Sequence, residues 1–400
     1  MNIKKMTFVM AVAAMATGTS FGAGFGIYEA SARGNAMGGG LVGSTGDASA
    51  NYYNPANLTE CTNISVMVGI SLINPFCDVK VDNIQRSKMN AGWFPPPHAY
   101  VAAPLTKDLV FGFGTYCEYG LGTKYDNSWP LKFDTTETTI EQFTFNPNIA
   151  YKITEDWSVA FGARMSYITF ENYKSPIVGM HPLAGAVYGR SHLKGDDFNC
   201  GYMLATQYKI TDDLSFGAVY RSRINHRIAG DFDLNTPAGM ISGDADAKLT
   251  LPASVVMGLN YDITERFRGG VSVTWTEWST VNHLDFNLPT ELITQELNWH
   301  DAWRVGFGFE YDFTGNFCGR IGYTYDCDPS AEAHGTTMLP PGDRHIVGFG
   351  IGYKFFDNWN IDLGYNFIMM ESETRMVEGH KFQCDNSYSH IASLSVTYNF

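Results

Sequence analysis

The sequence predicts an all-β protein, a 14-stranded antiparallel transmembrane β-barrel. Three observations predict this fold: segments in which apolar residues alternate with small or polar ones, short turns that alternate with long polar connections, and an export signal at the N-terminus. An alternation with a period of two places one set of side chains on each face of a strand. Together they describe an exported chain whose strands each have one apolar face.

The alternation is clearest in four segments, 159–167, 305–311, 347–355 and 361–367. In each segment one face is apolar and carries aromatic residues, whereas the other face mixes glycine with polar and charged residues. In a soluble sandwich the apolar face would be the core, and in a membrane barrel it meets lipid. The connections between the strands decide between these two folds.

Short turns and long connections alternate along the chain. The short turns share Thr, Asp or Asn, residues that satisfy turn backbone with their side chains, and lie at 105–108, 153–156, 210–213, 263–266, 313–316 and 355–358. The longer polar connections lie near 75–96, 124–141, 171–198, 228–249, 281–298, 327–342 and 371–388. Six short turns and seven long connections join fourteen strands, with both chain ends on the short-turn side. This sorting is typical of bacterial outer-membrane barrels.

Residues 1–22 have the pattern of a secretory signal peptide. Lys4 and Lys5 precede an apolar run over 6–16, and small residues follow it. We expect cleavage after Gly22, which makes Ala23 the first mature residue. The apolar run is too short for a transmembrane helix, and no later segment reaches 18 continuous apolar residues. The expected location is therefore the bacterial outer membrane.

The charge of the mature chain excludes nucleic acid as a partner. Removal of two lysines leaves 27 − 2 = 25 basic residues against 41 acidic ones, a net charge of 25 − 41 = −16. Binding to phosphate backbones needs a basic face, which this composition does not provide.

Cysteine usage gives no metal site. The seven cysteines are scattered without metal-ligand spacing, at positions 61, 77, 117, 200, 318, 327 and 384. Cys61 and Cys77 are the expected local pair if a disulfide forms in the exported protein. The alternative is that most of the seven are small apolar fillers or free thiols. We expect no metal, no cofactor and no catalytic set.

The two ends of the mature chain have different expected roles. Residues 23–60 are rich in Gly, Ala, Ser and Asn and show no strand alternation, so we expect them to form a plug, or hatch, inside the lumen of a barrel made by 61–400. The last strand ends on Phe400, with apolar residues alternating from Ala392. A terminal aromatic residue resembles the signal by which the barrel assembly machinery selects outer-membrane proteins.

At this point the chain resembles the FadL-type long-chain fatty acid transporters of the outer membrane. The resemblance begins at Ala23-Gly24-Phe25, continues to Asn54-Pro55-Ala56 and includes Glu118-Tyr119-Gly120-Leu121 with Tyr125. Further short motifs follow in the family's order: Tyr220-Arg221-Ser222, Leu251-Pro252, Trp278-Ser279, Asp301-Ala302-Trp303-Arg304, Leu339-Pro340 and Asp343-Arg344. The resemblance covers the whole mature chain.

The resemblance implies passive uptake of long-chain fatty acids or similar hydrophobic molecules by a monomer that contacts outer-membrane lipid. Ligand would be caught at the outer face and bound in an apolar pocket beside the N-terminus. It would leave sideways through a gap at a kink in the third strand. No reaction is needed, so the chain is not expected to be an enzyme.

The family's functional residues fall on particular positions here. Phe25 matches a pocket phenylalanine, and its alternative role is to anchor the hatch. Asn54, Pro55 and Ala56 shape the hatch, and would form its gate if the hatch moves. Glu118, Tyr119, Gly120 and Leu121 match the kink, where a glycine inside a strand permits a bulge.

The headgroup site departs from the family pattern. Lys174 falls where the family has a basic pocket residue, and its alternative role is that of a solvated loop-base lysine. The family's second basic residue would fall near Gln295, where the chain has no Lys or Arg, and His300 is the one substitute. This weakens the case for a fatty acid and leaves room for neutral hydrophobic cargo.

Other lumen charges, Arg164, Arg221, Arg304, Glu310 and Asp362, are expected to form a structural network between hatch and wall. Three alternatives remain open. The first is uptake of aromatic hydrocarbons by the same route. The second is an outer-membrane lipid hydrolase using His390 and Ser393, although these residues form no recognisable nucleophile motif. The third is a structural barrel or adhesin, which predicts no apolar pocket and no lateral opening.

Overall fold

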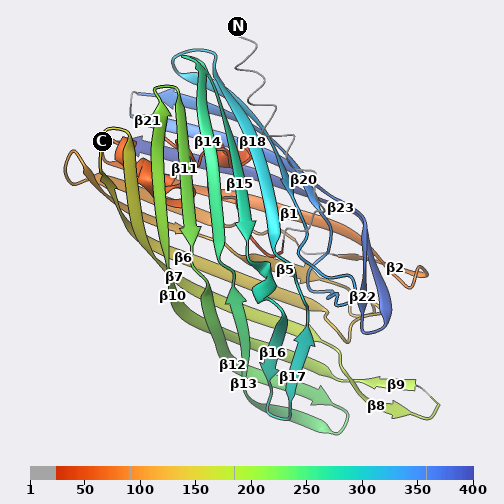
Figure 1. Cartoon of the computed structure of the whole chain (residues 1–400). Helices are drawn as coiled ribbons and strands as arrows, with labels where there is room; N and C mark the ends of the chain where they lie inside the picture. The colour runs from red at the N-terminus through yellow and green to blue at the C-terminus, as the bar shows by residue number, and fades with distance from the viewer. Residues whose placement is uncertain (1–23, 90–91, 184, 357) are drawn as a thin grey trace.

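The fold is a closed antiparallel β-barrel (Figure 1). The computed structural model describes residues 24–89, 92–183, 185–356 and 358–400, so the expected signal peptide and cleavage site lie outside the described residues. The wall consists of β1 (Ser65–Val81), β3 (Pro97–Pro104), β4 (Leu109–Tyr116), β5 (Gly120–Lys124), β6 (Glu137–Lys152), β7 (Trp157–Lys174), β10 (Arg190–Thr211), β11 (Leu214–Arg221), β12 (Ile224–Thr236), β13 (Gly239–Leu251), β14 (Ser254–Thr264), β15 (Phe267–Thr276), β18 (Ala302–Asp312), β19 (Phe317–Asp326), β20 (Arg344–Phe355), β21 (Trp359–Met370) and β23 (His380–Asn399).

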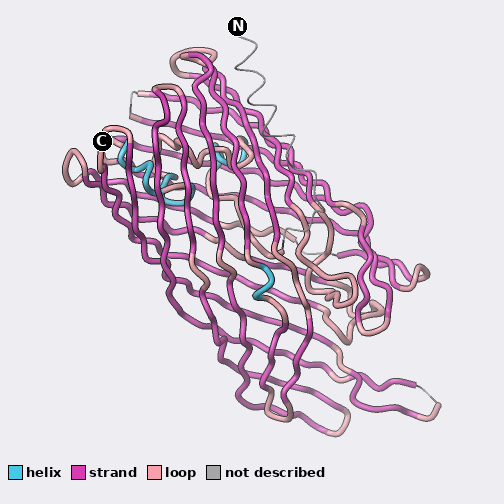
Figure 2. Tube along the Cα trace, in the orientation of Figure 1, coloured by secondary structure: helices cyan, strands magenta, loops and turns pink. Residues whose placement is uncertain are grey.

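Shorter elements complete the chain. They are α2 (Ala32–Ala36), α3 (Ala50–Tyr53), η1 (Pro55–Glu60), β2 (Gln85–Met89), β8 (Ile177–His181), β9 (Gly185–Tyr188), η2 (Trp278–Thr280), β16 (His283–Asn287), β17 (Leu292–Glu296) and β22 (Glu373–Val377). Figure 2 shows how few residues are helical compared with the strands of the wall.

Several crossings of the wall are made by two consecutive strands. These are β4 with β5, β11 with β12, β13 with β14, β15 with β16, β17 with β18, and β21 with β22. With each pair taken as one crossing, the barrel has 14 strands, as the alternation of turns predicts. The barrel closes because β1 pairs with β23, from Ser65 opposite Asn399 to Val81 opposite Phe382.

The short turns have the geometry that their threonines predict. The Thr106 hydroxyl accepts hydrogen bonds from the backbone N–H groups of Asp108 and Leu109, at 3.2 and 3.1 Å. Equivalent bonds to the following backbone are made by Thr154, Thr211, Thr264 and Thr314. A side-chain acceptor that satisfies two N–H groups lets the chain reverse within a few residues.

Most of the predicted long polar connections contain paired strands. Only 124–141 and 327–342 are largely loop, whereas the other five contain hairpins of extended strand. Residues 228–249, for example, form β12 and β13, which pair from Ile224 opposite Leu251 to Thr236 opposite Gly239. Polar residues on both faces suit a strand that continues beyond lipid into water. Figure 1 shows these hairpins extending at the end opposite the C-terminus.

The outer surface of the wall is apolar. Large exposed side chains follow the outward positions of the strands, among them Phe161, Leu204, Trp303, Phe349 and Leu363. Such a band of apolar and aromatic residues is the lipid-facing surface of an outer-membrane barrel. Separately, the described helices include none that is both long enough and apolar enough to cross a membrane.

Residues 24–60 lie against the inner face of the wall at several points around the barrel. The Ala32 N–H donates to Ser395 of β23 at 2.9 Å. On other strands, the Asn260 amide donates to the Gly40 carbonyl at 2.9 Å, and Asn51 donates to the carbonyl of Val101 at 3.0 Å. In Figure 1 this red-to-orange segment is enclosed by the strands. Its contacts therefore reach β3, β14 and β23.

Inward-facing glycines bring this segment close to the wall. A Cβ atom at Gly322, Gly348 or Gly364 would lie 2.6–2.7 Å from the carbonyl oxygens of Ala36, Asn35 and Ala32, respectively. Contacts this short would force backbone apart, so only a residue without a side chain fits at these positions. The glycine face seen in the sequence is therefore the surface on which α2 packs.

Candidate functional site

The start of the described chain pairs with the third crossing of the wall. Strand β4 ends at Tyr116 and β5 begins at Gly120, so the ladder is interrupted over 117–119. The Gly120 N–H donates to the Phe25 carbonyl at 3.0 Å, and the Ile27 N–H donates to the Glu118 carbonyl at 2.8 Å. The N-terminal residues thus replace the missing wall partner on the inner side of the break.

Side chains satisfy the remaining polar groups of the break. The Gln142 side-chain oxygen accepts hydrogen bonds from the N–H groups of Glu118 and Tyr119, at 3.0 and 3.3 Å. The buried Glu118 carboxylate pairs with Arg164 at 2.7 Å and with Arg221 at 3.3 Å. A buried charge is stable only when it is paired and hydrogen-bonded, so this network holds the break in one conformation.

The second crossing of the wall contains β3, and beside the break β3 has no described strand paired with it on the side that faces β5. Strand β3 pairs with β4 from Ala99 to Pro104, and no described pairing joins it to β5. Just before Ala99, the chain runs through Pro95, Pro96 and Pro97, which have no N–H group to donate to a neighbouring strand. The ring of Phe94 lies against Gly122, where a Cβ atom would overlap it.

A cavity of about 300 Å³ lies at this gap, and its walls are mainly apolar. It is bordered by residues 24–29, by β1 and by both sides of the break. Its lining includes the inward-facing Gln142 and the outward-facing Phe143, adjacent residues of β6, and also Phe76, which is exposed on the outer wall. The cavity is therefore bordered by residues of both faces of the wall, and its volume lies near the lower end of the range for ligand pockets.

A second, smaller apolar cavity of about 40 Å³ lies beside Phe25. Leu121, Ile140, Phe170 and Trp299 contribute to its lining. The Phe25 ring contacts an aromatic cluster made of Tyr119, Trp278 and Trp299, with centroid distances of 5.6, 4.9 and 6.0 Å. Phe25 and Leu121 border both cavities. Their side chains therefore lie between the larger cavity and the smaller one.

Asn54, Pro55 and Ala56 form a buried turn against the wall. The Asn54 side chain caps η1 by accepting from the Ala56 N–H at 3.1 Å, and Pro55 occupies the first position of η1. The Asn54 amide also donates to the carbonyls of Val42 and Thr206, at 2.8 and 3.0 Å. These contacts fix the turn both within the N-terminal segment and to β10.

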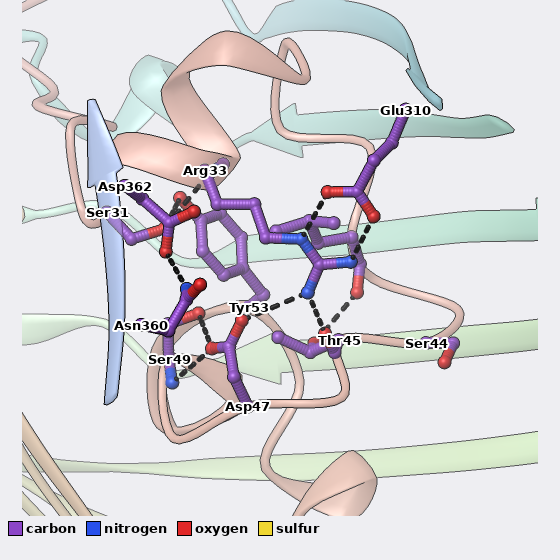
Figure 3. A network of polar contacts seen from close by, with 12 residues as sticks. Ser31, Arg33, Ser44, Thr45, Asp47, Ser49, Tyr53, Glu310, Asn360 and Asp362 are labelled. Carbon is purple, nitrogen blue, oxygen red and sulfur yellow. Dashed lines mark hydrogen bonds and ion pairs between the residues drawn. The ribbon is translucent and has the colours of Figure 1, made fainter. Parts of the chain in front are cut away.

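An ion network fastens the N-terminal segment to the opposite wall (Figure 3). The Arg33 guanidinium, from α2, donates two parallel hydrogen bonds of 3.1 Å to Glu310 of β18 and pairs with Asp47 at 3.0 Å. Glu310 is also bound by Arg320, which pairs with Asp362 at 2.6 Å. Of the residues predicted to form one lumen network, Glu310 and Asp362 belong to this one, whereas Arg164 and Arg221 pair with Glu118, and Arg304 pairs with Asp326. The cavity beside the Arg33 network, about 400 Å³, is lined by charged and polar residues and does not suit apolar cargo.

The two predicted headgroup residues lie away from both apolar cavities. Lys174 ends β7 and pairs across the ladder with Ser191 of β10, on the extended hairpins. His300 is exposed and precedes β18, where its N–H donates to the Pro329 carbonyl at 2.9 Å. The structure brings Phe25 and residues 118–121 together and leaves Lys174 and His300 apart from them.

Two of the alternatives considered for the sequence are not supported by the structure. Cys61 packs against the cluster around Leu58, whereas Cys77 is buried in a different cluster with Cys384, so Cys61 and Cys77 cannot be a local pair. All seven thiols are unbonded. His390 bonds to the outward-facing Tyr365 hydroxyl and Ser393 bonds inward to Asn35, so the pair expected for a hydrolase lies on opposite faces. The described residues also contain no cluster of metal ligands.

Sequence reasoning missed several residues of this site. Gln142 and Pro95–Pro97 have the pattern of ordinary strand or loop, and Arg344 stands out only as part of a motif. The three consecutive prolines next to a predicted strand were a usable signal for an unpaired edge. Nothing local in the sequence indicates that Gln142 binds the broken strand.

A closed 14-stranded barrel with an apolar outer wall and an apolar cavity at a strand break defines an outer-membrane transport barrel. Residues 13–400 match the family described as outer membrane protein transport protein (OMPP1/FadL/TodX). The chain belongs to this family, whose members are outer-membrane transporters of hydrophobic compounds. The predicted location and the prediction of a transporter in place of an enzyme are confirmed.

Individual relatives agree with this assignment. The chain is 23% identical to a long-chain fatty acid transport protein of Escherichia coli O6:H1, with 94% of this chain and 93% of the relative covered. It is 25% identical to a 47 kDa outer membrane protein of Pasteurella multocida, with 98% of each covered.

Solved structures share the fold at low identity. A Pseudomonas aeruginosa FadL homologue superposes with a TM-score of 0.86 at 19% identity, over 94% of this chain and 100% of that one. The toluene transporter TodX of P. putida superposes with a TM-score of 0.75 at 19% identity, over 96% and 99%.

Proposed function

We propose that this protein takes up long-chain fatty acids or similar hydrophobic molecules across the outer membrane without chemical change. Cargo binds in the apolar cavity between residues 24–29 and the broken third crossing, and leaves sideways into the membrane through the gap between β3 and β5. The single observation that carries the proposal is a mainly apolar cavity of about 300 Å³ that is lined by residues of both faces of the wall.

Apolar burial supplies the binding energy. Each methylene that moves from water into the cavity contributes about 0.8 kcal/mol, so a long acyl chain gains several times the energy of a short one. Because the wall of the barrel is surrounded by lipid, the cargo leaves one apolar environment for another on exit. This small difference in free energy lets a passive transporter bind its ligand and still release it.

The N-terminal segment favours a sideways exit over a straight one. As a proposed plug, residues 24–60 contact β3, β10, β14, β18 and β23 and place the Arg33 ion network across the short-turn end. An apolar molecule that crossed this network would leave its apolar surroundings and displace buried charge pairs, which is costly. The gap at the break offers a path whose lining is mainly apolar.

Uptake of aromatic hydrocarbons by the same route is the second candidate. It is favoured by the cluster of Phe25, Tyr119, Trp278 and Trp299, whose rings would stack on flat aromatic cargo. One of the solved structures that share the fold is a toluene transporter. The smaller cavity beside this cluster is too small for a long acyl chain.

Mass spectrometry of ligand that copurifies with the detergent-solubilised protein tests the function. We expect a long-chain amphiphile, and we expect a fluorescent fatty acid to bind and to be displaced by unlabelled fatty acid. Displacement by toluene and not by fatty acid would favour the second candidate. Absence of any saturable binding by either class would contradict transport of hydrophobic cargo.

The monomeric state of the protein and the recognition of Phe400 by the barrel assembly machinery stay predictions.

A further inference from the structure

Arg344 is a cation in the apolar cavity at the strand break. It begins β20 on the inward-facing side of that strand, and the cavity lining includes both Arg344 and Ile346, the next inward residue. Arg344 is half-buried, and a guanidinium beside apolar walls needs acceptors for its five N–H groups.

The acceptors around Arg344 are incomplete. One terminal nitrogen donates to the Gly24 carbonyl at 3.1 Å, whereas the buried Nε atom has no hydrogen-bond partner. Among the residues that the structure describes, Arg344 takes part in no ion pair. By contrast, Arg304 in the same cavity pairs with Asp326 at 3.0 Å and lies 4.1 Å from the Tyr28 ring centre. An unsatisfied buried donor is costly, and a ligand with acceptor oxygens would remove that cost.

Neighbouring carboxyl groups leave this positive charge uncompensated. Asp326 lies opposite Arg344 in the β19–β20 ladder, but its carboxylate is engaged by Arg304. Glu29 also borders the cavity and makes no ion pair within 4.0 Å among the described residues. Burial raises the pKa of the Glu29 carboxyl above its ordinary value, which favours its neutral form. No carboxylate of the residues that the structure describes therefore forms an ion pair with Arg344.

We propose that Arg344 binds the carboxylate of an amphiphilic ligand whose hydrocarbon chain lies in the cavity at the strand break. This inference rests on the proposed function and names the headgroup that Lys174 and His300 do not reach. A guanidinium can hold a carboxylate through two parallel hydrogen bonds, and Arg344 borders the cavity in which the chain would lie. The ligand class is therefore a long-chain carboxylic acid in preference to its neutral analogues.

The test compares a fatty acid with its methyl ester in the purified full-length protein. Both have the same chain, and only the acid carries a negative charge. Arg344→Gln is expected to weaken binding of the acid about tenfold or more, because a charge-assisted pair is lost, and to leave binding of the ester nearly unchanged. Arg344→Lys, which keeps the charge, is expected to recover part of the affinity for the acid.

Lys174→Gln is the matched control, because it removes one cation outside both cavities. We expect it to affect neither ligand. Equal weakening of acid and ester by Arg344→Gln would assign Arg344 to anchoring the Gly24 carbonyl and overturn the headgroup role. Unchanged binding of both ligands would also overturn it. If the unmodified protein binds neither acid nor ester, the proposed function fails, and this result is distinct from a failure of the Arg344 assignment alone.

Discussion

At the scale of single residues, the proposal concerns which cargo the cavity accepts. The apolar walls would suit any hydrophobic molecule, whereas the proposed role of Arg344, with Glu29 beside it, would make the cavity sensitive to the charge of the headgroup. The family resemblance indicated Lys174, by its position along a strand. The sequence alone could not indicate Arg344 in this role, because the lack of an ion partner depends on which strands Asp326 and Arg304 occupy.

Binding of a fatty acid is expected to depend on pH through Glu29. A carboxyl whose pKa is raised by burial is neutral below that pKa and charged above it. The ionised ligand therefore binds best while Glu29 is neutral, and its affinity falls as pH rises through the Glu29 pKa. The charged or titratable groups that interact with Glu29 include Arg304, Arg344 and Tyr53.

Glu29→Gln checks this directly. The variant keeps the shape of the side chain and removes its titration, so the affinity for the acid should stay constant over the pH range in which the unmodified protein loses it. Fluorescent fatty acid titrations at several pH values measure the effect. The same pH dependence in both proteins would show that Glu29 does not face the headgroup.

At the scale of elements, the decisive feature is the break between β4 and β5. Its position at 117–119 falls where the family resemblance places a kink. The groups that hold the break are distant in sequence: the Phe25 carbonyl, the Gln142 side chain and the proline run before β3. Local periodicity carries no information on such contacts, so sequence reasoning could place the break and could not explain its stability.

Gly120→Val is expected to reduce uptake sharply while the barrel still folds. A Cβ atom at Gly120 would overlap the end of the Ile27 side chain, so a valine would push the N-terminal residues away from the break and narrow the gap. Uptake of labelled fatty acid by cells measures the effect, with the folded barrel checked by its electrophoretic mobility before and after heating.

Gly179→Val is the matched control, since nothing lies within 4 Å of a Cβ atom at that position on β8. It should leave uptake unchanged. Normal uptake by Gly120→Val would contradict a path that passes the break.

The predicted long connections show what sequence reasoning left out at the scale of elements. Five of the seven long connections contain hairpins, because their strands continue past the membrane with polar residues on both faces. The alternation with a period of two arises because side chains that face lipid are apolar, whereas those that face the lumen are small or polar. Outside lipid this contrast disappears, although the backbone pairing continues.

For the molecule as a whole, the N-terminal segment and the wall are complementary surfaces. Glycines on the inner face accept the backbone of α2, and Arg33 joins it to Glu310 across the lumen. The number of strands was predictable because turns and alternation are local signals. The packing of Cys77 beside Cys384 was not, since it requires the closure of β1 on β23.

Gly322→Val should destabilise the folded protein by about 1–3 kcal/mol, the usual cost of overpacking. A Cβ atom there would lie 2.6 Å from the Ala36 carbonyl oxygen, so either the wall or α2 must move. The temperature at which the barrel loses its heat-modifiable mobility on electrophoresis measures the change. An unchanged midpoint would mean that residues 24–60 do not press on the wall in the membrane.

The most direct test of the whole account is a crystal structure of the protein soaked with a long-chain fatty acid that carries bromine at the end of its chain. The anomalous signal is expected within the cavity at the gap, near Phe76 and Phe143, with the carboxylate next to Arg344. A signal beside Arg33 and Glu310, in the polar cavity at the short-turn end, would place the path straight through the lumen and contradict lateral exit.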